Sequence, residues 1–312
     1  MHFITSPKRK KAVMPLLKLV NWLNPRMPKT MVQIRHLLRM KRFAHLRNPQ
    51  DLNEKILWLA LNTDTREWSR LADKYEVREY VRDCGLDVIL IPQYGVWNNV
   101  NEIDFENLPN SFILKPTHGS GDAVVVKDKK SANLNNVKEK IQESLNSYLI
   151  TSSAELHYGR IPHRVVAEQL LQNDPISERY SATIIDYKIW CFNGKACYNL
   201  VISNRSIHNK DGADFMTYDR DWNAHPEYCR ETPDFTLAEP LPKPAEYEHM
   251  LEVAERLAKP FPLVRVDLYN LNGNIYFGEM TFTSYGGIMD YFSDLFLKKA
   301  GSEIDLSKEM KK

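Results

Sequence analysis

The first fifty residues of this 312-residue chain contain no acidic side chain. Twelve lysines and arginines precede Asp51, the first carboxylate. This leaves 30 of the 42 basic residues against 40 acidic ones, a net charge of −10 on the rest of the chain. A basic arm on an acidic body indicates a surface that meets an anionic partner. Because no nucleic-acid recognition motif accompanies the basic residues, we predict that this partner is not a nucleic acid.

Long hydrophobic runs are also missing. A membrane-spanning helix needs about 20 apolar residues, whereas the apolar stretch 12–23 is shorter and contains Lys18. It has no small-residue cleavage site, which argues against a signal peptide. Helical spacing instead predicts a basic amphipathic helix with one apolar face, formed by Leu16, Leu17, Val20 and Leu23. We expect a cytoplasmic protein whose residues 1–47 either lie on the anionic inner face of the plasma membrane or pack on the body of the protein.

Cysteine is scarce, with four residues and no C-x-x-C pair. This spacing favours reduced thiols of a cytosolic protein over disulfide or metal use. With 43% hydrophobic and 26% charged residues, the composition is ordinary, so general disorder is not expected.

The remaining pattern alternates helices with antiparallel hairpins and predicts an α+β (mixed α/β) fold. Helices are expected over residues 68–84, 134–149 and 247–258. Strands are expected over residues 112–115, 124–126, 165–171, 184–191, 196–202, 264–269 and 275–280. The turns Asn193-Gly194 and Asn272-Gly273-Asn274 join the last four strands into two hairpins. Residues 219–244 are expected to form a long irregular loop.

A glycine-bearing loop follows the strand that ends at Lys115. The loop contains Thr117, His118, Gly119, Ser120 and Gly121. Glycines let backbone N–H groups approach a phosphate closely, and the lysine supplies a positive charge. A Walker P-loop and a dinucleotide fingerprint are both excluded, because the lysine precedes the glycines and no helix follows. The alternative is an ordinary hairpin turn beside a surface lysine.

The late hairpin carries two carboxylates. A three-residue turn at 272–274 would place Asp267 opposite Glu279, and Arg265 opposite Thr281, all on one face. Carboxylates that face each other repel, but a divalent cation between them removes the repulsion, and oxygen ligands suit Mg²⁺. A two-residue turn would separate the carboxylates onto opposite faces. The alternative to a metal site is a solvated polar face on which Arg265 offsets the acids.

Two further charges lie in apolar strands. Burying the charge of Glu168 in such a strand costs free energy unless a partner is present. Glu168 could belong to a hinge that presents polar groups to adenine, or it could lie on an edge strand. Lys188 shares a strand face with Asp186 and Trp190. We consider Lys188 a second phosphate ligand, or else a surface lysine.

Taken in chain order, the lysine strand, glycine loop, acid-bearing strand and R-x-D…E-x-T hairpin resemble the ATP-grasp superfamily. In its D-alanine ligase type, an arginine two residues before the aspartate helps to stabilise the transferring phosphoryl group, and Arg265 stands in this position before Asp267. The same pattern ends E-x-N, with the acid and the asparagine on magnesium. This chain departs from it at Thr281, although a hydroxyl also coordinates Mg²⁺.

More narrowly, the chain resembles the TupA-like ATP-grasp family of bacterial surface polysaccharide clusters. The matching phrases are Asn53–Trp58, Ala72–Val81, Leu108–Lys115 with His118–Gly121, Asp186–Gly194, and Arg265–Tyr269 through Gly278–Phe282. The resemblance implies ATP held between two α+β lobes. It divides the chain into a basic helical arm (1–50), a helical region (51–108), a lobe with the glycine loop and hinge (109–172) and a lobe with the magnesium hairpin (173–312).

The implied activity is a ligase that uses ATP and Mg²⁺ to join a carboxylate to an amine through an acyl phosphate, in capsule, teichuronic acid or lipopolysaccharide synthesis. Its substrate would be a small molecule or a lipid-linked saccharide. Lys115 and Lys188 would bind phosphates and Arg265 would stabilise the transferring group. Asp267, Glu279 and Thr281 would bind Mg²⁺. Residues 117–121 would cover ATP, with the role of His118 open, and the adenine hinge would comprise Glu168, Gln169, Leu170 and Leu171.

Three other functions are compatible with parts of the pattern. A glycosyltransferase that uses a nucleotide sugar would explain the D-x-D spelling of Asp219-Arg220-Asp221. A sugar kinase would use the same nucleotide machinery but would release a phosphorylated product without an amide. A non-catalytic ATP-binding scaffold is the third, although the complete set of charged residues argues against it.

Overall fold

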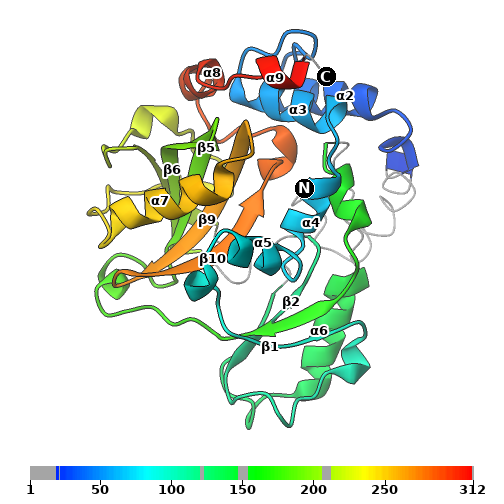
Figure 1. Cartoon of the computed structure of the whole chain (residues 1–312), viewed down its shortest axis with the longest axis vertical. Coiled ribbons are helices and arrows are strands. Elements are labelled where there is room, and N and C mark those ends of the chain that lie inside the picture. Colours follow the sequence, from blue (N-terminus) through cyan, green and yellow to red (C-terminus); the bar gives the residue numbers. More distant parts are fainter. Residues whose placement is uncertain (1–18, 21, 120–122, 147–153, 206–211, 311–312) are drawn as a thin grey trace.

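The computed structural model describes residues 19–20, 22–119, 123–146, 154–205 and 212–310. It contains two antiparallel-rich sheets with helices packed around them, which confirms the α+β class (Figure 1). The predicted apolar positions Leu16 and Leu17, and the loop residues Ser120 and Gly121, lie outside the described residues.

The small sheet has the order β1-β4-β2-β3 and is antiparallel throughout. Its strands are β1 (Gln93–Trp97), β2 (Phe112–Pro116), β3 (Val124–Val126) and β4 (Val165–Glu168). Helix α6 (Leu134–Asn146) packs on it through Val137, Ile141 and Leu145, which recur at helical spacing. Strand β4 lies inside the sheet, so Glu168 does not lie on an edge strand; β4 also ends at Glu168 and not at Leu171.

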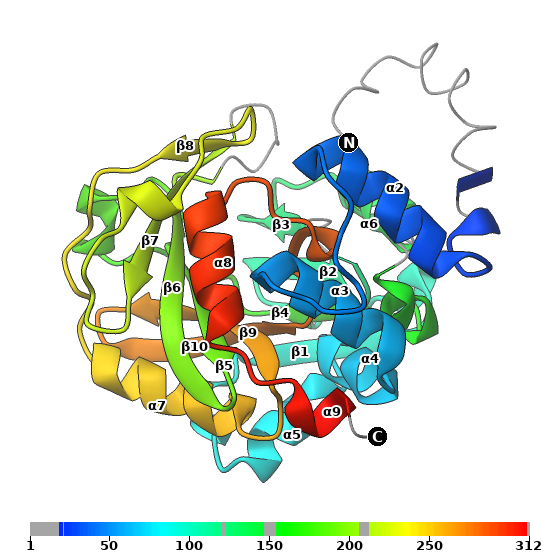
Figure 2. The ribbon, with the colours of Figure 1, turned by 90° about the horizontal axis from the view of Figure 1, so that it is seen from above.

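The large sheet has the order β10-β9-β5-β6-β7-β8, and only the short β8 runs parallel to its neighbour. Its strands are β5 (Asp186–Phe192), β6 (Lys195–Ser203), β7 (Ala213–Asp219), β8 (Phe235–Leu237), β9 (Leu263–Leu271) and β10 (Asn274–Thr281). Helix α7 (Tyr247–Ala258) has the predicted bounds and covers β5, β6 and β9 (Figure 2). The region 219–244 is largely irregular, as expected, but it includes β8.

Six further helices lie in the described parts of the chain. They are α2 (Pro28–Met40), α3 (Leu52–Asn62), α4 (Arg66–Ala72), α5 (Val77–Asp83), α8 (Asp294–Ser302) and α9 (Ser307–Met310). Short 3₁₀ turns are η1 (Asp87–Ile89), η2 (Val100–Glu102), η3 (Leu156–Arg160), η4 (Ser177–Arg179), η5 (Pro226–Tyr228) and η6 (Ser284–Gly287). All four cysteines are free. Within the described parts of the chain, every helix is too short or too polar to cross a bilayer.

The single helix predicted over 68–84 is wrong, because two helices, α4 and α5, meet at Asp73. The Asp73 carboxylate accepts hydrogen bonds from the backbone N–H groups of Tyr75 at 2.8 Å and Glu76 at 3.3 Å, and its own backbone is extended. An aspartate that binds nearby backbone donors competes with helical hydrogen bonding. The break directs Lys74 away from the helix surface and towards the loop at 117–119.

The hairpin β9–β10 corrects one prediction and confirms another. The turn has two residues, Asn272 and Gly273, and pairs Leu271 with Asn274, so the three-residue turn is wrong. A β-bulge at Gly278 then shifts the register by one residue. Asp267 consequently faces Glu279, as predicted. A side chain at 278 would meet the backbone, since an added Cβ would lie 2.9 Å from the carbonyl oxygen of Asp267.

Candidate active site

Three neighbouring strands bring the predicted charged residues into a row. Lys188 on β5 pairs with Asp267 on β9, and Asp267 pairs with Glu279 on β10. Because paired residues of adjacent strands point to the same face, these side chains lie side by side across the large sheet. The next row, Trp190, Arg265 and Thr281, runs parallel to it.

Asp267 is the centre of this charge cluster. Its two oxygens accept hydrogen bonds from Nε and Nη2 of Arg265 at 2.6 and 2.7 Å, and Lys188 also donates to it. The Lys188 ammonium lies 2.8 Å from Asp186 as well. Burial raises the pKa of Asp267, but Arg265 and Lys188 outweigh this effect and hold the pKa below its usual value. The carboxylate is therefore ionised.

Arg265 connects the two rows. Its Nη2 donates to Thr281 Oγ1 at 3.1 Å and to Glu279 Oε1 at 3.4 Å, and Nη1 donates to Ser284. Burial lowers the pKa of Arg265, but the Asp267 carboxylate more than compensates and holds it above its usual value. A planar guanidinium fixed by so many acceptors is positioned to contact an anion without reorientation.

The oxygen atoms of three residues could bind a Mg²⁺ ion that is also coordinated by phosphate oxygens. Asp267, Glu279 and Thr281 supply two carboxylates and a hydroxyl, and the Thr281 hydroxyl lies 3.2 Å from Glu279 Oε1. Among the described residues, no three acidic, histidine or cysteine side chains form a complete metal cage. Mg²⁺ usually takes one or two protein carboxylates and completes its shell with water and phosphate oxygens. Magnesium at these residues stays a prediction.

The small sheet contributes a second ion-pair cluster. Lys115 on β2 donates to Glu168 Oε2 at 2.8 Å, and Arg78 on α5 lies 3.4 Å from Glu168 Oε1. These two cations explain how a buried strand can carry Glu168. Gln169, Leu170 and Leu171 follow directly, and the Gln169 N–H donates to Pro92 O at 2.9 Å. The adenine hinge also stays a prediction.

The base of the glycine loop is anchored within the small lobe. Thr117 is fully buried, and its hydroxyl donates to Pro162 O at 2.6 Å. The ring of His118 stacks on His163 with centroids 3.7 Å apart. Gly119 has a φ of +74°, which favours glycine, and its carbonyl accepts a hydrogen bond from Lys74 Nζ at 2.8 Å.

Four residues at the site were missed from the sequence: Lys74, Arg78, Tyr158 and Ser284. Burial lowers the pKa of Lys74 although Glu279 opposes this, and Lys115 adds to the lowering. The pKa of Lys74 is therefore influenced by Lys115 of the small sheet and by Glu279 of the large sheet. Burial raises the pKa of Tyr158, and Glu279 adds to the effect, so its phenol stays protonated. The phrase Ala72–Val81 contained Lys74 and Arg78, but their partners lie far away in sequence.

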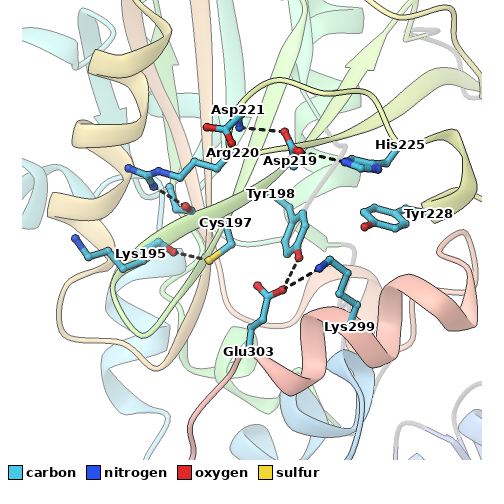
Figure 3. A pocket seen from close by; sticks show the side chains of 11 residues that line it. Lys195, Cys197, Tyr198, Asp219, Arg220, Asp221, His225, Tyr228, Lys299 and Glu303 are labelled. Atoms are coloured by element: carbon cyan, nitrogen blue, oxygen red, sulfur yellow. Dashed lines mark hydrogen bonds and ion pairs between the residues drawn. The ribbon is translucent and has the colours of Figure 1, made fainter.

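A separate cavity of about 620 Å³ lies beside the D-x-D sequence (Figure 3). Asp219 accepts from the backbone N–H groups of Asp221 at 3.0 Å and Asn223 at 2.8 Å, and from the Asn223 side chain at 2.9 Å. Arg220 pairs with Glu255 at 2.7 Å. This is an aspartate that stabilises its own turn, and the geometry gives no support to paired metal ligands of a glycosyltransferase.

Comparison with known families gives one match: the family described as TupA-like ATP-grasp matches residues 54–305. A comparison with curated proteins finds no match.

Three of the solved structures to which the chain is similar are ligases. The D-alanine–D-alanine ligase of Bacillus anthracis complexed with ATP has 16% identity and a TM-score of 0.43, over 75% of this chain and 61% of that one. The corresponding enzyme of Helicobacter pylori has 15% identity and a TM-score of 0.44, over 82% and 70%. The L-amino acid ligase of Bacillus licheniformis has 14% identity and a TM-score of 0.46, over 82% and 57%. The chain thus spans about three fifths of the first of these enzymes.

Proposed function

The chain belongs to the TupA-like ATP-grasp family and has the ATP-grasp fold, and from this premise we propose that it is an ATP- and Mg²⁺-dependent ligase that joins a carboxylate to an amine. The observation that supports the proposal most is the row Lys188, Asp267 and Glu279 with Arg265 beside it. Cations and carboxylates so arranged can hold a triphosphate and its metal in one orientation.

The chemistry needs two displacements, because an amine does not displace the oxygen of a carboxylate. In the first, a carboxylate oxygen attacks the γ-phosphorus of ATP, the bond to the β,γ-bridging oxygen breaks and ADP leaves. In the second, the amine nitrogen attacks the carbonyl carbon of the acyl phosphate. Inorganic phosphate leaves with the bonding electrons, and the nitrogen loses a proton to solvent. The protein mainly positions groups and stabilises charge.

Each charged side chain has a role in these steps. Lys115 and Lys188 contact phosphate oxygens from the small and large sheets, and their carboxylate partners keep both ammonium groups in place. Arg265 stabilises the charge on the transferring phosphoryl group. Bound Mg²⁺ would neutralise phosphate charge, held by Asp267, Glu279 and Thr281.

The remaining residues enclose the nucleotide. Residues 117–121 would cover the phosphates, and Lys74 donates to the Gly119 carbonyl at the base of this loop. Glu168 to Leu171 face the adenine. His118, stacked on His163 in the base of the loop, has no assigned chemical step.

The substrates belong to bacterial surface polysaccharide synthesis. We propose a uronic acid or amino acid as the carboxylate and an amino acid or amino sugar as the amine, either free or on a lipid-linked saccharide. The carboxylate donor is proposed from the ATP-grasp fold, and the polysaccharide context is inferred from the sequence resemblance alone.

Calorimetric titration with ATP and Mg²⁺ tests the proposal, with UDP-glucose and UDP-glucuronate as controls. We expect Mg²⁺-dependent ATP binding that Lys115→Ala abolishes, followed by ADP release when a suitable carboxylate and amine are both present. Binding of a UDP-sugar without ATP binding would contradict the ligase and favour a glycosyltransferase. ADP release with a stable phosphorylated sugar and no amide would identify a kinase.

A further inference from the structure

The N-terminal segment presents an unusual number of exposed hydrophobic side chains. Of the fifteen large hydrophobic residues that are exposed in the described chain, seven lie between residues 19 and 43. We call them the apolar N-terminal surface: Leu19, Trp22, Met27, Ile34, Leu37, Leu38 and Phe43. Two of them, Leu38 and Phe43, are 65% and 60% exposed. Exposed apolar residues this frequent in one short segment indicate an interaction surface.

Helix α2 has apolar residues on both its inner and its outer side. Its buried side contains Met31, Val32 and His36, and Arg39 donates to both oxygens of Asp290 at 3.1 Å. Its outer side carries Ile34, Leu37 and Leu38. A surface helix normally turns its apolar stripe towards the core. Within the part of the chain that the structure describes, no other segment covers these outward leucines, so they are available to a partner.

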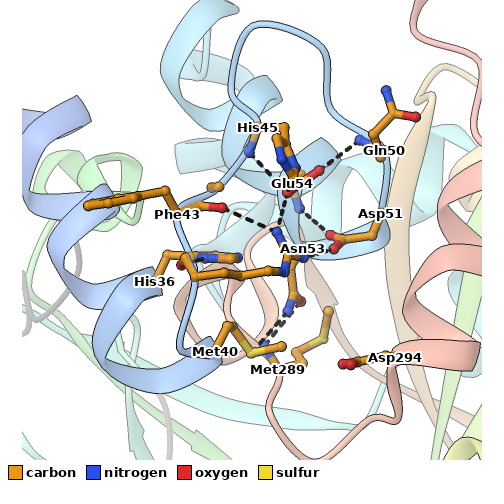
Figure 4. A network of polar contacts seen from close by, with 12 residues as sticks. His36, Met40, Phe43, His45, Gln50, Asp51, Asn53, Glu54, Met289 and Asp294 are labelled. Carbon is orange, nitrogen blue, oxygen red and sulfur yellow. Dashed lines mark hydrogen bonds and ion pairs between the residues drawn. The ribbon is translucent and has the colours of Figure 1, made fainter.

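A polar network holds the inner side of this segment on the protein (Figure 4). Glu54 on α3 is completely buried and accepts from Arg42 at 2.6 Å, from His45 Nδ1 at 2.8 Å and from the Gln50 N–H at 2.8 Å. Arg42 also contacts Asp51. The segment that carries the apolar N-terminal surface is therefore held in place on α3.

The charges within the segment that carries this surface are of one sign. Four exposed basic residues accompany it: Arg26, Lys29, Lys41 and Arg47. The Arg26 guanidinium lies 4.3 Å from the ring centroid of Trp22. No carboxylate precedes Asp51 in the sequence. Apolar and aromatic residues among lysines and arginines match the interface of an anionic bilayer. A second copy of the chain would instead bring two basic surfaces together.

We propose that the apolar N-terminal surface inserts into the headgroup region of an anionic lipid bilayer. The inner side of the same helix packs against Tyr285, because the Arg39 guanidinium lies 4.4 Å from its ring centroid, and Tyr285 directly follows Ser284, which accepts a hydrogen bond from Arg265. Docking would thus place the site next to the membrane surface, within reach of lipid-linked molecules. The proposal does not depend on the ligase activity.

Sedimentation of the full-length protein with vesicles tests it, using phosphatidylcholine alone and phosphatidylcholine mixed with phosphatidylglycerol. We expect binding only to the anionic vesicles, weakened by salt. Ile34→Glu/Leu38→Glu should weaken that binding by about tenfold or more, since two side chains leave the apolar phase. Val88→Glu is the matched control, because Val88 is 87% exposed but lies far along the chain in η1.

Several outcomes would overturn the proposal. One is equal vesicle binding by the double variant and the parent, which would assign membrane contact to another segment. Another is that the parent protein does not bind vesicles at all. The surface would then be covered by a second copy of the chain or by another protein. Phe43→Glu provides a second variant should the double variant unfold, and the unfolding midpoint of each is compared with the parent. If the parent protein does not bind ATP, the proposed ligase activity is contradicted, but the outcome of the vesicle experiment still decides the membrane proposal.

Discussion

At the scale of single residues, Asp267 has the most demanding position, because the proposed role requires it to bind Mg²⁺ while two cations occupy its oxygens. Asp267→Asn removes the negative charge and leaves Arg265 and Lys188 partly unpaired. We expect Mg²⁺-dependent ADP release to fall about a hundredfold or more. The measurement is steady-state turnover at saturating ATP.

Asp221→Asn is the matched control for this prediction. Asp221 is an exposed aspartate of the D-x-D sequence, so its substitution should leave turnover unchanged. Near-full turnover in Asp267→Asn would remove the metal role of Asp267, whereas loss of turnover in Asp221→Asn would reopen the glycosyltransferase alternative.

At the scale of elements, the bulge in β10 keeps Glu279 opposite Asp267. In Gly278→Ala the added Cβ would lie 2.9 Å from the Asp267 carbonyl oxygen, so backbone must move. We expect a loss of about 1–3 kcal/mol of stability, as for other overpacked positions. Turnover should fall by more than the folded fraction does, because the hairpin pair moves apart.

Denaturant unfolding and turnover of Gly278→Ala are measured side by side. Asn274→Ala serves as control, since Asn274 is exposed on the same strand. Wild-type turnover in folded Gly278→Ala would show that the register at the bulge is not needed for the reaction.

The hydrogen bonds that attach residues 42–50 to Glu54 of α3 predict that the stability of the fold depends on pH. Burial raises the pKa of Glu54, but hydrogen bonds from Gln50, His45 and Arg42 bring it from 4.5 to about 2. A depressed pKa stabilises the fold above the unfolded value, and this contribution disappears as the pH falls from 4.5 towards about 2. In Glu54→Gln we expect a smaller loss of unfolding free energy across that window.

The test compares denaturant unfolding at the two ends of the window for wild type, Glu54→Gln and the exposed control Glu106→Gln. An identical pH slope in wild type and Glu54→Gln would mean that other carboxylates account for the acid sensitivity of the fold.

The same elements separate what the sequence can predict from what it cannot. Alternation of apolar and polar residues placed Asp267 and Glu279 on one face, because the core side of the hairpin is fixed by its hydrophobic residues. The two-residue turn and the bulge at Gly278 compensate each other. Asn272-Gly273 and a glycine inside a strand are the local signals of these two features, but the opposite faces expected for a two-residue turn argued against that turn. Lys74 and Arg78 were missed because their partners, Gly119 and Glu168, are 45 and 90 residues away.

At the scale of the whole molecule, the candidate nucleotide ligands are divided between two sheets. Lys115 belongs to the small sheet and Lys188 to the large one. If ATP bridges the sheets, binding stabilises the folded protein as a unit, by about 2.7 kcal/mol at a hundredfold excess over Kd. Lys115→Met and Lys188→Met should each lose most of this increment.

Thermal unfolding with and without Mg²⁺-ATP measures that increment against the ligand-free state of each variant, so that intrinsic destabilisation cancels. Lys195→Met, whose side chain is 75% exposed beside the separate cavity, should retain the full shift. If Lys188→Met kept the wild-type shift while Lys115→Met lost it, ATP would be held by the small lobe alone. The large-sheet row would then serve a substrate other than ATP, because its charges would have no phosphate to neutralise.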